Sequence, residues 1–307
     1  MMTRVALLCG GKSAEREVSI RGGQAVRQAL ESRGYVVKIF DPATDLLDLV
    51  KEASYFDAAF LVLHGPGGED GTIQGLLDLL GLPYQGAGVL GSALAMDKKL
   101  SKELYRLAGL NVPKAVELQK GGPFPAEMIE EIGFPLVVKP VSQGSSIGLS
   151  LVEKKEDLPA ALEAAFRHEK RVLLEEYLPG RELTVGVLGE EALPVVEIIP
   201  GERHRFFDYE AKYTPGATEE ICPAKIPSEV AQEAQRCAIK AHQVLRLRHY
   251  SRTDMIYAHN KLYLLETNTI PGMTETSLLP LAAKVAGYSF EDLVEKLLQM
   301  ALNSETT

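Results

Sequence analysis

The stretch RVALLCGGKSAERE, residues 4–17, decides the fold class at the start of the chain. Residues 4–9 form a short apolar run that ends at two glycines, which is typical of a buried strand followed by a tight loop. A helix from about Ser19 to Gly34 and a second apolar strand over 35–40 are expected to follow. Strands that alternate with helices indicate a right-handed parallel sheet.

Two glycine-rich, acidic loops are expected at the carboxyl ends of strands in this sheet. The first is GGKSAERE at 10–17, and the second is HGPGGEDG at 64–71, which follows an apolar strand over 57–63. A helix over about 44–53 precedes that strand, and another helix runs from the second loop to Gly81. Ligands bind at this edge of open α/β sheets, so both loops are candidates for a binding site.

The regular alternation of strands and helices changes near Met96, and the segment that follows indicates a smaller α+β unit that ends near residue 180. Helices are expected over 97–109, 125–132, 156–168 and 228–245, with two more at the C-terminal end, and strands over 115–119, 134–140, 147–152, 172–178, 182–188, 193–199, 250–257 and 262–267. Residues 200–222 lack clear periodicity, and a loop of that length is usually functional. Its segment FFDYEAKYT (206–214) is typical of a closing lid, with an irregular loop as the alternative.

Composition limits the class of protein. A chain of 307 residues is too long for one core and favours two or three domains. The net charge of −9 argues against a nucleic-acid partner. Three unrelated cysteines form neither a disulfide framework nor a metal motif, which favours a reducing compartment. The sequence contains no signal peptide and no run of about 18 apolar residues, so we expect a soluble, cytoplasmic protein without membrane partners.

The segment RTDMIYAHNKLYLLETN (252–268) predicts a hairpin that carries a metal site. Residues two apart share a face of a strand, so Arg252 lies beside Asp254 and Glu266 beside Asn268. If residue 254 faces residue 266, two carboxylates and an amide oxygen converge, which is a donor set that suits Mg²⁺. A solvated polar face on an edge hairpin is the alternative.

The segment VVKPVSQGSSIG (137–148) predicts a loop that covers a phosphate group. Lys139 ends an apolar strand, and the small residues that follow let backbone N–H groups approach an anion. The GxxxxGK spacing of a Walker A loop is absent. A hairpin turn without a ligand is the alternative.

Three weaker candidates remain. The segment EEYL (175–178) at the end of a strand would offer backbone groups to an adenine, although adjacent glutamates are often surface charge. Glu15 would hold a substrate ammonium, or it simply stabilises the start of a helix. His64 would bind substrate, or it is an ordinary loop histidine.

The chain resembles the D-alanine–D-alanine ligases of the ATP-grasp superfamily. The resemblance rests on long motifs in family order: GGKSAEREVS (10–19), HGPGGEDG (64–71), GSALAMDK (91–98), VVKPVSQGSSIG (137–148), YEAKYT (209–214), RTD (252–254) and LLETNTIPGMTETSL (264–278). It implies three α/β or α+β domains, at 1–96, 97–180 and 181–307, with a lid at about 200–222. ATP would be held between the second and third domains.

The resemblance also implies roles for single residues. Those that would bind ATP are Lys98, Lys139, Ser145, Ser146, Gly148, Glu175, Glu176, Tyr177, Leu178, Glu182 and Lys212. Those that would hold two Mg²⁺ (or Mn²⁺) ions are Asp254, Glu266 and Asn268. Those that would bind the two D-alanines are Glu15, His64, Ser277 and Leu278. Glu15 would be linked to Ser145 and Tyr213, Lys212 would contact the transferred phosphate, and Arg252 and the Gly272 N–H would form an oxyanion hole.

The implied reaction joins two D-alanines for peptidoglycan precursors through an acyl phosphate, and the family resemblance implies a homodimer. The alternatives are a ligase that makes a D-alanine–D-lactate ester, an ATP-grasp ligase for another carboxylate, and a non-catalytic ATP-binding regulator. Tyr213 in EAKYT favours the dipeptide over the ester, because the ester-forming branch departs from the family at this tyrosine. Glu15 and Ser277 argue against another carboxylate, and Arg252, Asp254 and Glu266 argue against a silent binder.

Overall fold

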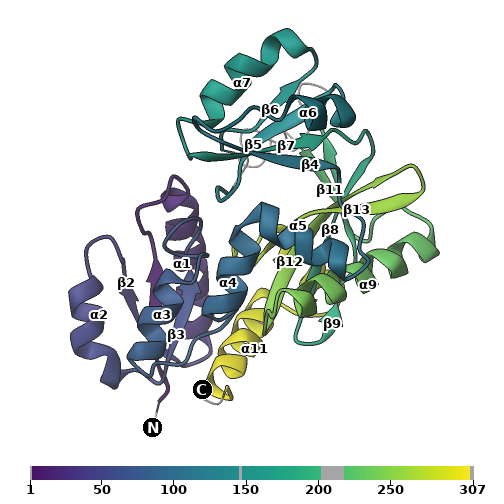
Figure 1. Cartoon of the computed structure of the whole chain (residues 1–307). Coiled ribbons are helices and arrows are strands. Elements are labelled where there is room, and N and C mark those ends of the chain that lie inside the picture. Colours follow the sequence, from purple (N-terminus) through teal and green to yellow (C-terminus); the bar gives the residue numbers. More distant parts are fainter. Residues whose placement is uncertain (1, 145–146, 202–217, 305–307) are drawn as a thin grey trace.

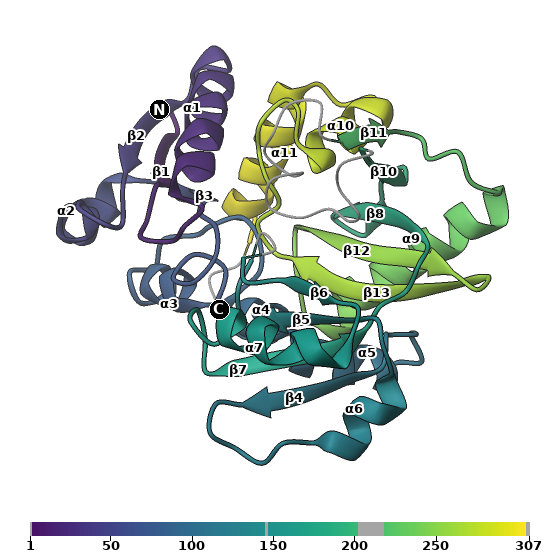
Figure 2. The same ribbon diagram turned by 90° about the horizontal axis from the view of Figure 1, so that it is seen from above.

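The computed structural model describes residues 2–144, 147–201 and 218–304. These residues form three sheets, each with its own covering helices (Figures 1 and 2). The first sheet is parallel and the other two are antiparallel, which confirms the predicted mixture of α/β and α+β structure. Within the described residues, none of the helices is long and apolar enough to cross a membrane.

The first sheet has the strand order β2-β1-β3. Its strands are β1 (Arg4–Cys9), β2 (Val36–Phe40) and β3 (Ala58–Val62), and its helices are α1 (Arg16–Ser32), α2 (Leu46–Glu52) and α3 (Thr72–Leu79), with a short 3-10 turn η1 (Ala53–Tyr55). Val5 and Leu7 face one apolar cluster, whereas Ala6 and Leu8 face another. The unbroken apolar run therefore has a simple cause, since β1 is buried on both faces.

The C-terminal helices pack against this first sheet. They are α10 (Leu278–Val285) and α11 (Phe290–Leu302), and Figure 1 shows α11 in yellow between the first sheet and the third. Leu293 and Leu297 of α11 share a cluster with Val5 and Leu7 of β1. The two ends of the chain thus contribute to one core, and the division at residues 96 and 180 stays a prediction.

The second sheet has the order β4-β7-β5-β6. Its strands are β4 (Ala115–Gln119), β5 (Leu136–Pro140), β6 (Ser150–Val152) and β7 (Arg171–Glu176). The helices α6 (Ala126–Ile132) and α7 (Leu158–Ala165), with the 3-10 turn η2 (Lys155–Asp157), cover one face and leave the other turned toward the third sheet (Figure 1).

The third sheet has the order β11-β10-β8-β12-β13, and β9 pairs with β8. Its strands are β8 (Arg181–Leu188), β9 (Glu191–Ala192), β10 (Val196–Pro200), β11 (Thr218–Ile221), β12 (Tyr250–Ala258) and β13 (Lys261–Asn268). The helices α4 (Val89–Met96), α5 (Lys98–Leu107) and α9 (Ser228–Val244) pack on it. His259 and Asn260 have φ of 51° and 57°, the backbone of a two-residue hairpin turn.

Two of the elements that the sequence analysis did not predict are α4 and β11. The helix α4 was not predicted, because VLGSALAM is apolar on every side and has no helical period to recognise. The strand β11 lies at the end of the segment expected to be irregular, where Thr218–Ile221 pairs with β10. Both elements depend on contacts with neighbouring elements, α4 on α5 and β13 and β11 on β10, and neither has a clear periodicity in its own sequence.

Candidate active site

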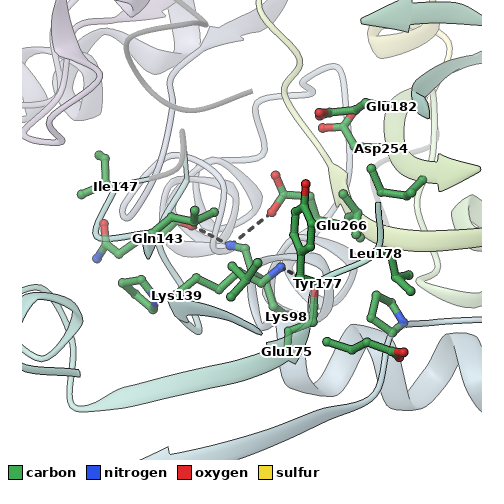
Figure 3. Close-up of a pocket in the computed structure, with 17 residues that line it drawn as sticks. Lys98, Lys139, Gln143, Ile147, Glu175, Tyr177, Leu178, Glu182, Asp254 and Glu266 are labelled. Atoms are coloured by element: carbon green, nitrogen blue, oxygen red, sulfur yellow. Dashed lines mark hydrogen bonds and ion pairs between the residues drawn. The ribbon is translucent and has the colours of Figure 1, made fainter. Parts of the chain in front are cut away.

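A pocket lies between the second and third sheets and includes about 900 Å³ of space, part of it open to solvent (Figure 3). Much of its lining comes from residues that the sequence assigns to ATP or metal: Lys98, Lys139, Glu175, Glu176, Tyr177, Leu178, Glu182, Asp254 and Glu266. The structure therefore gathers residues far apart in the chain into one cavity. Gly148 lies between two lining residues, Ile147 and Leu149.

The β12–β13 hairpin forms one wall of this pocket. Its pairing sets Arg252 opposite Asn268 and Asp254 opposite Glu266, which confirms the alignment on which the predicted metal site depends. Arg252 donates from Nε and Nη2 to the two oxygens of Asp254, both at 2.9 Å. Asn268 Nδ2 donates to Asp254 Oδ2 at 3.0 Å. Asp254 is thus the centre of a small polar cluster.

A bulge in β13 brings two consecutive residues to the pocket. The register steps from Asp254–Glu266 to Met255–Leu264, so Leu265 is an extra residue without a partner. Neighbours on a regular strand point to opposite faces, but a bulge breaks that alternation. Leu265 and Glu266 consequently both line the cavity. The sequence did not predict this bulge.

The predicted metal ligands fit Mg²⁺ by their chemistry. Asp254 and Glu266 both line the pocket, and Asn268 contacts Asp254. Two carboxylates and an amide are oxygen donors of the kind that Mg²⁺ prefers, with further positions left for phosphate and water. Within the described part of the chain, no group of three or more His, Cys, Asp or Glu side chains is arranged for a metal ion. Phosphate oxygens would therefore have to complete the coordination.

Two lysines face the same cavity. Lys98 Nζ donates to the Gln143 carbonyl at 2.6 Å and lies 3.4 Å from Glu266 Oε2, as the dashed lines in Figure 3 show. Lys139 Nζ donates to Glu175 Oε1 at 3.0 Å. Both side chains are about nine-tenths buried, so their charges are little screened by solvent. This wall is suited to an anion such as a phosphate chain.

Glu175 is a buried carboxylate rather than a surface charge. It is 3% exposed and lies between Lys139 and Lys102, whose Nζ is 2.9 Å from Glu175 Oε2. Burial favours the neutral acid, but the two lysines outweigh it and lower the pKa of Glu175 below its usual value. Burial lowers the pKa of Lys102 to about 8. Lys102 was not predicted as a site residue, and no local signal marks it.

Apolar side chains from both sheets form a slot beside the charged groups. Val137 lies two residues before Lys139 on β5, and Ile256 lies two residues after Asp254 on β12. Both line the pocket, together with Pro113, Ile147, Leu149 and Leu265. A slot with apolar walls suits a flat base such as adenine. Strand alternation could have identified Val137 and Ile256, because each shares a face with a predicted residue.

The two N-terminal loops meet close to the loop that follows β5. Glu15 is 6% exposed, and a Cβ at Gly144 would lie 2.9 Å from its Oε2. A Cβ at Gly65 would lie 3.1 Å from the same oxygen. His64 is 8% exposed, and its Nε2 has no hydrogen-bond partner among the described residues. Burial lowers the pKa of His64, which favours the neutral ring. Glu15 and His64 therefore form a buried polar corner.

Glu69 joins that corner to the third sheet, although it was not predicted as a site residue. Its Oε2 accepts from the Gly65 N–H at 2.8 Å, and its Oε1 accepts from the Ile270 N–H at 3.2 Å. Burial and the nearby Glu15 carboxylate raise the pKa of Glu69 to about 8. Its only signal in the sequence is its place in the acidic loop HGPGGEDG.

The turn after β13 places Gly272, Ser277 and Leu278 together. A Cβ at Gly272 would lie 2.9 Å from Ser277 Oγ, so only glycine fits there without displacement. Ser277 is the N-cap residue of α10, which begins at Leu278, and its side chain does not cap the helix. The first N–H groups of a helix attract anions, so this corner is suited to a carboxylate.

The remaining predicted residues lie outside the described part of the structure. These are Ser145 and Ser146 of the glycine loop, and Lys212 and Tyr213 of the predicted lid. Their roles stay predictions from the sequence.

Comparisons with known proteins agree with this geometry. A family model described as "D-ala D-ala ligase C-terminus" matches residues 104–299, and one described as "D-ala D-ala ligase N-terminus" matches residues 41–87. The D-alanine–D-alanine ligase of Syntrophobacter fumaroxidans is 54% identical over 97% of each chain. A crystal structure of the Bacillus anthracis D-alanine–D-alanine ligase is similar with a TM-score of 0.89, at 36% identity over 98% of this chain and 97% of that one.

The fold and its structural neighbours identify an ATP-grasp ligase. A second Bacillus anthracis structure, of the ligase complexed with ATP, has a TM-score of 0.87 and 33% identity, and covers 98% of this chain and 97% of its own. The chain belongs to the D-alanine–D-alanine ligase family.

Proposed function

We propose that this protein joins two D-alanines in an ATP-dependent reaction and so supplies D-alanyl-D-alanine for peptidoglycan precursors. One observation carries the proposal: a cavity lined by Lys98 and Lys139 together with Asp254 and Glu266, next to the buried corner of Glu15. The names of the curated relatives support the same activity.

Lysines and apolar groups bind ATP. The apolar slot of Val137, Ile256 and Leu265 holds the adenine, with the backbone of 176–178 at its edge and Glu182 toward the ribose. Lys98 and Lys139 neutralise phosphate oxygens in a site where solvent screens them little. The sequence motif assigns the covering of the phosphates to Ser145, Ser146 and Gly148.

Asp254, Glu266 and Asn268 hold two Mg²⁺ (or Mn²⁺) ions. When bound, the metal neutralises charge on the phosphate oxygens. Arg252 donates to both oxygens of Asp254, so it fixes that carboxylate and brings a positive charge close to the reacting groups. Arg252 and the Gly272 N–H stabilise the oxyanion that develops when the amine attacks.

The first D-alanine binds by its ammonium to Glu15, with His64 beside it, and ATP phosphorylates its carboxylate. The amine of the second D-alanine then attacks the acyl phosphate and releases phosphate. Ser277 and Leu278, at the start of α10, bind the carboxylate of this second substrate. Lys212 contacts the transferred phosphate, and Tyr213 and Ser145 link to Glu15. The sequence motifs alone support these last three roles.

The proposal includes a homodimer, which rests on the family resemblance. It also includes a location in the cytoplasm, where ATP is available. Product specificity follows from Tyr213, which favours the dipeptide over a D-alanine–D-lactate ester.

The test measures ADP release with D-alanine, L-alanine or D-lactate offered as donor and acceptor, and identifies the product by mass. We expect ADP release with D-alanine alone and a product of two D-alanines at neutral pH. D-alanine–D-lactate as the main product would move the protein to the ester-forming branch. ATP binding without ADP release under any substrate pair would identify a non-catalytic binder.

A further inference from the structure

Helix α5 presents two lysines that each contact both walls of the ATP pocket. Lys98 and Lys102 are four residues apart and so share one face of the helix. Lys98 Nζ contacts the Gln143 carbonyl beside the second sheet and Glu266 of the third. Lys102 Nζ contacts Glu175 Oε2 of the second sheet at 2.9 Å and the Leu264 carbonyl of the third at 3.2 Å.

Lys102 lies behind the pocket and does not line it. Its side chain is 2% exposed, and it is not among the residues to which the proposed reaction gives a role. The carbonyl that it contacts belongs to β13, the edge strand of its sheet, where an unpaired backbone group would otherwise remain. An ammonium this deeply buried is costly unless it is paired, so its placement calls for an explanation.

Lys102, Glu175 and Lys139 form a buried row of alternating charge. Glu175 accepts from Lys139 on one side and pairs with Lys102 on the other, and only Lys139 of the two lysines reaches the cavity. A phosphate in the cavity would compete with Glu175 for Lys139. If Lys139 were the only partner of Glu175, the movement of Lys139 to a phosphate would leave the Glu175 carboxylate buried and unpaired, which is strongly unfavourable.

We propose that Lys102 is a positioning residue of the nucleotide site: it is the permanent counter-ion of Glu175 and so frees Lys139 to bind a phosphate. The inference rests on the proposed ATP site. It gives Glu175 a second function besides its place at the adenine edge, because this carboxylate holds Lys139 at the wall of the cavity. Lys102 thus acts on ATP through two neighbours and touches no substrate.

The experiment measures the Kd of MgATP by calorimetry, and KM for ATP and kcat by ADP release, on the full-length protein. We expect K102M to raise the Kd and the KM for ATP by about 10- to 100-fold, with kcat changed less than about threefold, because Lys139 stays bound to Glu175. K99M is the matched control, since Lys99 pairs with Glu103 on the same helix outside the pocket. It should bind MgATP like the wild type.

The double variant K102M/E175Q separates this role from simple anchoring. Without the Glu175 carboxylate, no charge competes with the phosphate for Lys139. The double variant should therefore bind MgATP within about threefold of E175Q and more tightly than K102M. If Lys102 only held α5 against the two sheets, its loss would weaken MgATP binding by the same factor whether or not Glu175 is charged. That result would overturn the proposal. So would wild-type affinity in K102M.

Folding of each variant is checked by its thermal melt. If K102M does not fold, the comparison of E175Q with K102M/E175Q still decides, because the double variant removes both charges of the Lys102–Glu175 pair and leaves no unpaired carboxylate at residue 175. Failure of the wild-type protein to bind MgATP would refute the proposed ATP site itself, which is a different outcome from failure of the role of Lys102.

Discussion

Acidification is expected to weaken the fold through His242, a histidine of α9 that lies beneath the site. Its side chain is buried, and its Nδ1 lies 2.8 Å from Ser251 Oγ on β12, one residue before Arg252. Burial lowers the pKa of His242 from 6.5 to about 4. The native protein therefore contains the neutral ring across most of the acidic range.

The sign of the effect follows from proton linkage. Below pH 6.5 the unfolded chain takes up a proton at His242 that the folded chain does not bind, so stability falls as the pH falls from 6.5 to 4. With these two pKa values, moving from pH 7 to pH 4.5 should cost roughly 2 kcal/mol of unfolding free energy through this residue. His249, whose pKa burial also lowers to about 4, adds a loss in the same window.

The assay is urea unfolding of the wild type and H242Q at pH 7 and pH 4.5. Glutamine does not titrate and can still hydrogen-bond Ser251, so H242Q should lose roughly 2 kcal/mol less than the wild type between the two pH values. H259N changes an exposed histidine of the hairpin turn and should follow the wild type. An equal loss in H242Q and the wild type would refute the assignment of this effect to His242.

Three further changes test the site and the core. E266Q should lower kcat by roughly 100-fold or more at saturating Mg²⁺ with little change in melting temperature, and an unchanged kcat would remove Glu266 from the metal site. L297A should lower the unfolding free energy by about 2–5 kcal/mol in urea, because Leu297 is fully buried in the core shared by α11 and the first sheet; a loss below about 1 kcal/mol would contradict that packing. G148A should raise the KM for ATP several-fold, since φ is +71° and the new Cβ would lie 2.8 Å from His168. G121A has φ of +79° with open space around it, and an equal rise there would show that the effect is not local to the pocket.

Most of the fold could be predicted because its signals are local. The apolar run at Val5–Leu8, the turn at His259 and Asn260 and the alternation of strands with helices are all properties of short stretches. The packing of α11 on the first sheet could not be predicted in this way. Leu297 and Val5 are nearly the full length of the chain apart, and an amphipathic helix does not reveal which core it completes.

The candidate site was predictable where residues of a suitable type are spaced along the strands of a recognisable hairpin. The sequence contains the short turn that starts the hairpin pairing at Ala258 and Lys261, but Asp254 faces Glu266 only because the bulge at Leu265 shifts the register by one residue. The bulge at Leu265 depends instead on how the edge strand meets its surroundings, and no residue type at that position signals it. Residues of the apolar slot such as Ile256 follow from strand alternation once Asp254 is placed in the pocket.

Charged residues whose role depends on burial are the hardest to predict. Lys102 stands in KKLSKELYRL, where lysines three and four apart look like an ordinary solvated helix face. Lys99, three residues before Lys102, does lie on such a face and pairs with Glu103, whereas Lys102 is buried against Glu175. What separates the two lysines is the position of β7 and β13 around the helix, which is a tertiary property. The same holds for Glu69, because burial and the nearby Glu15 carboxylate, both tertiary properties, raise the pKa of its carboxyl to about 8. A net charge of −9 therefore predicts nothing about the site, because burial decides which of those charges interact strongly.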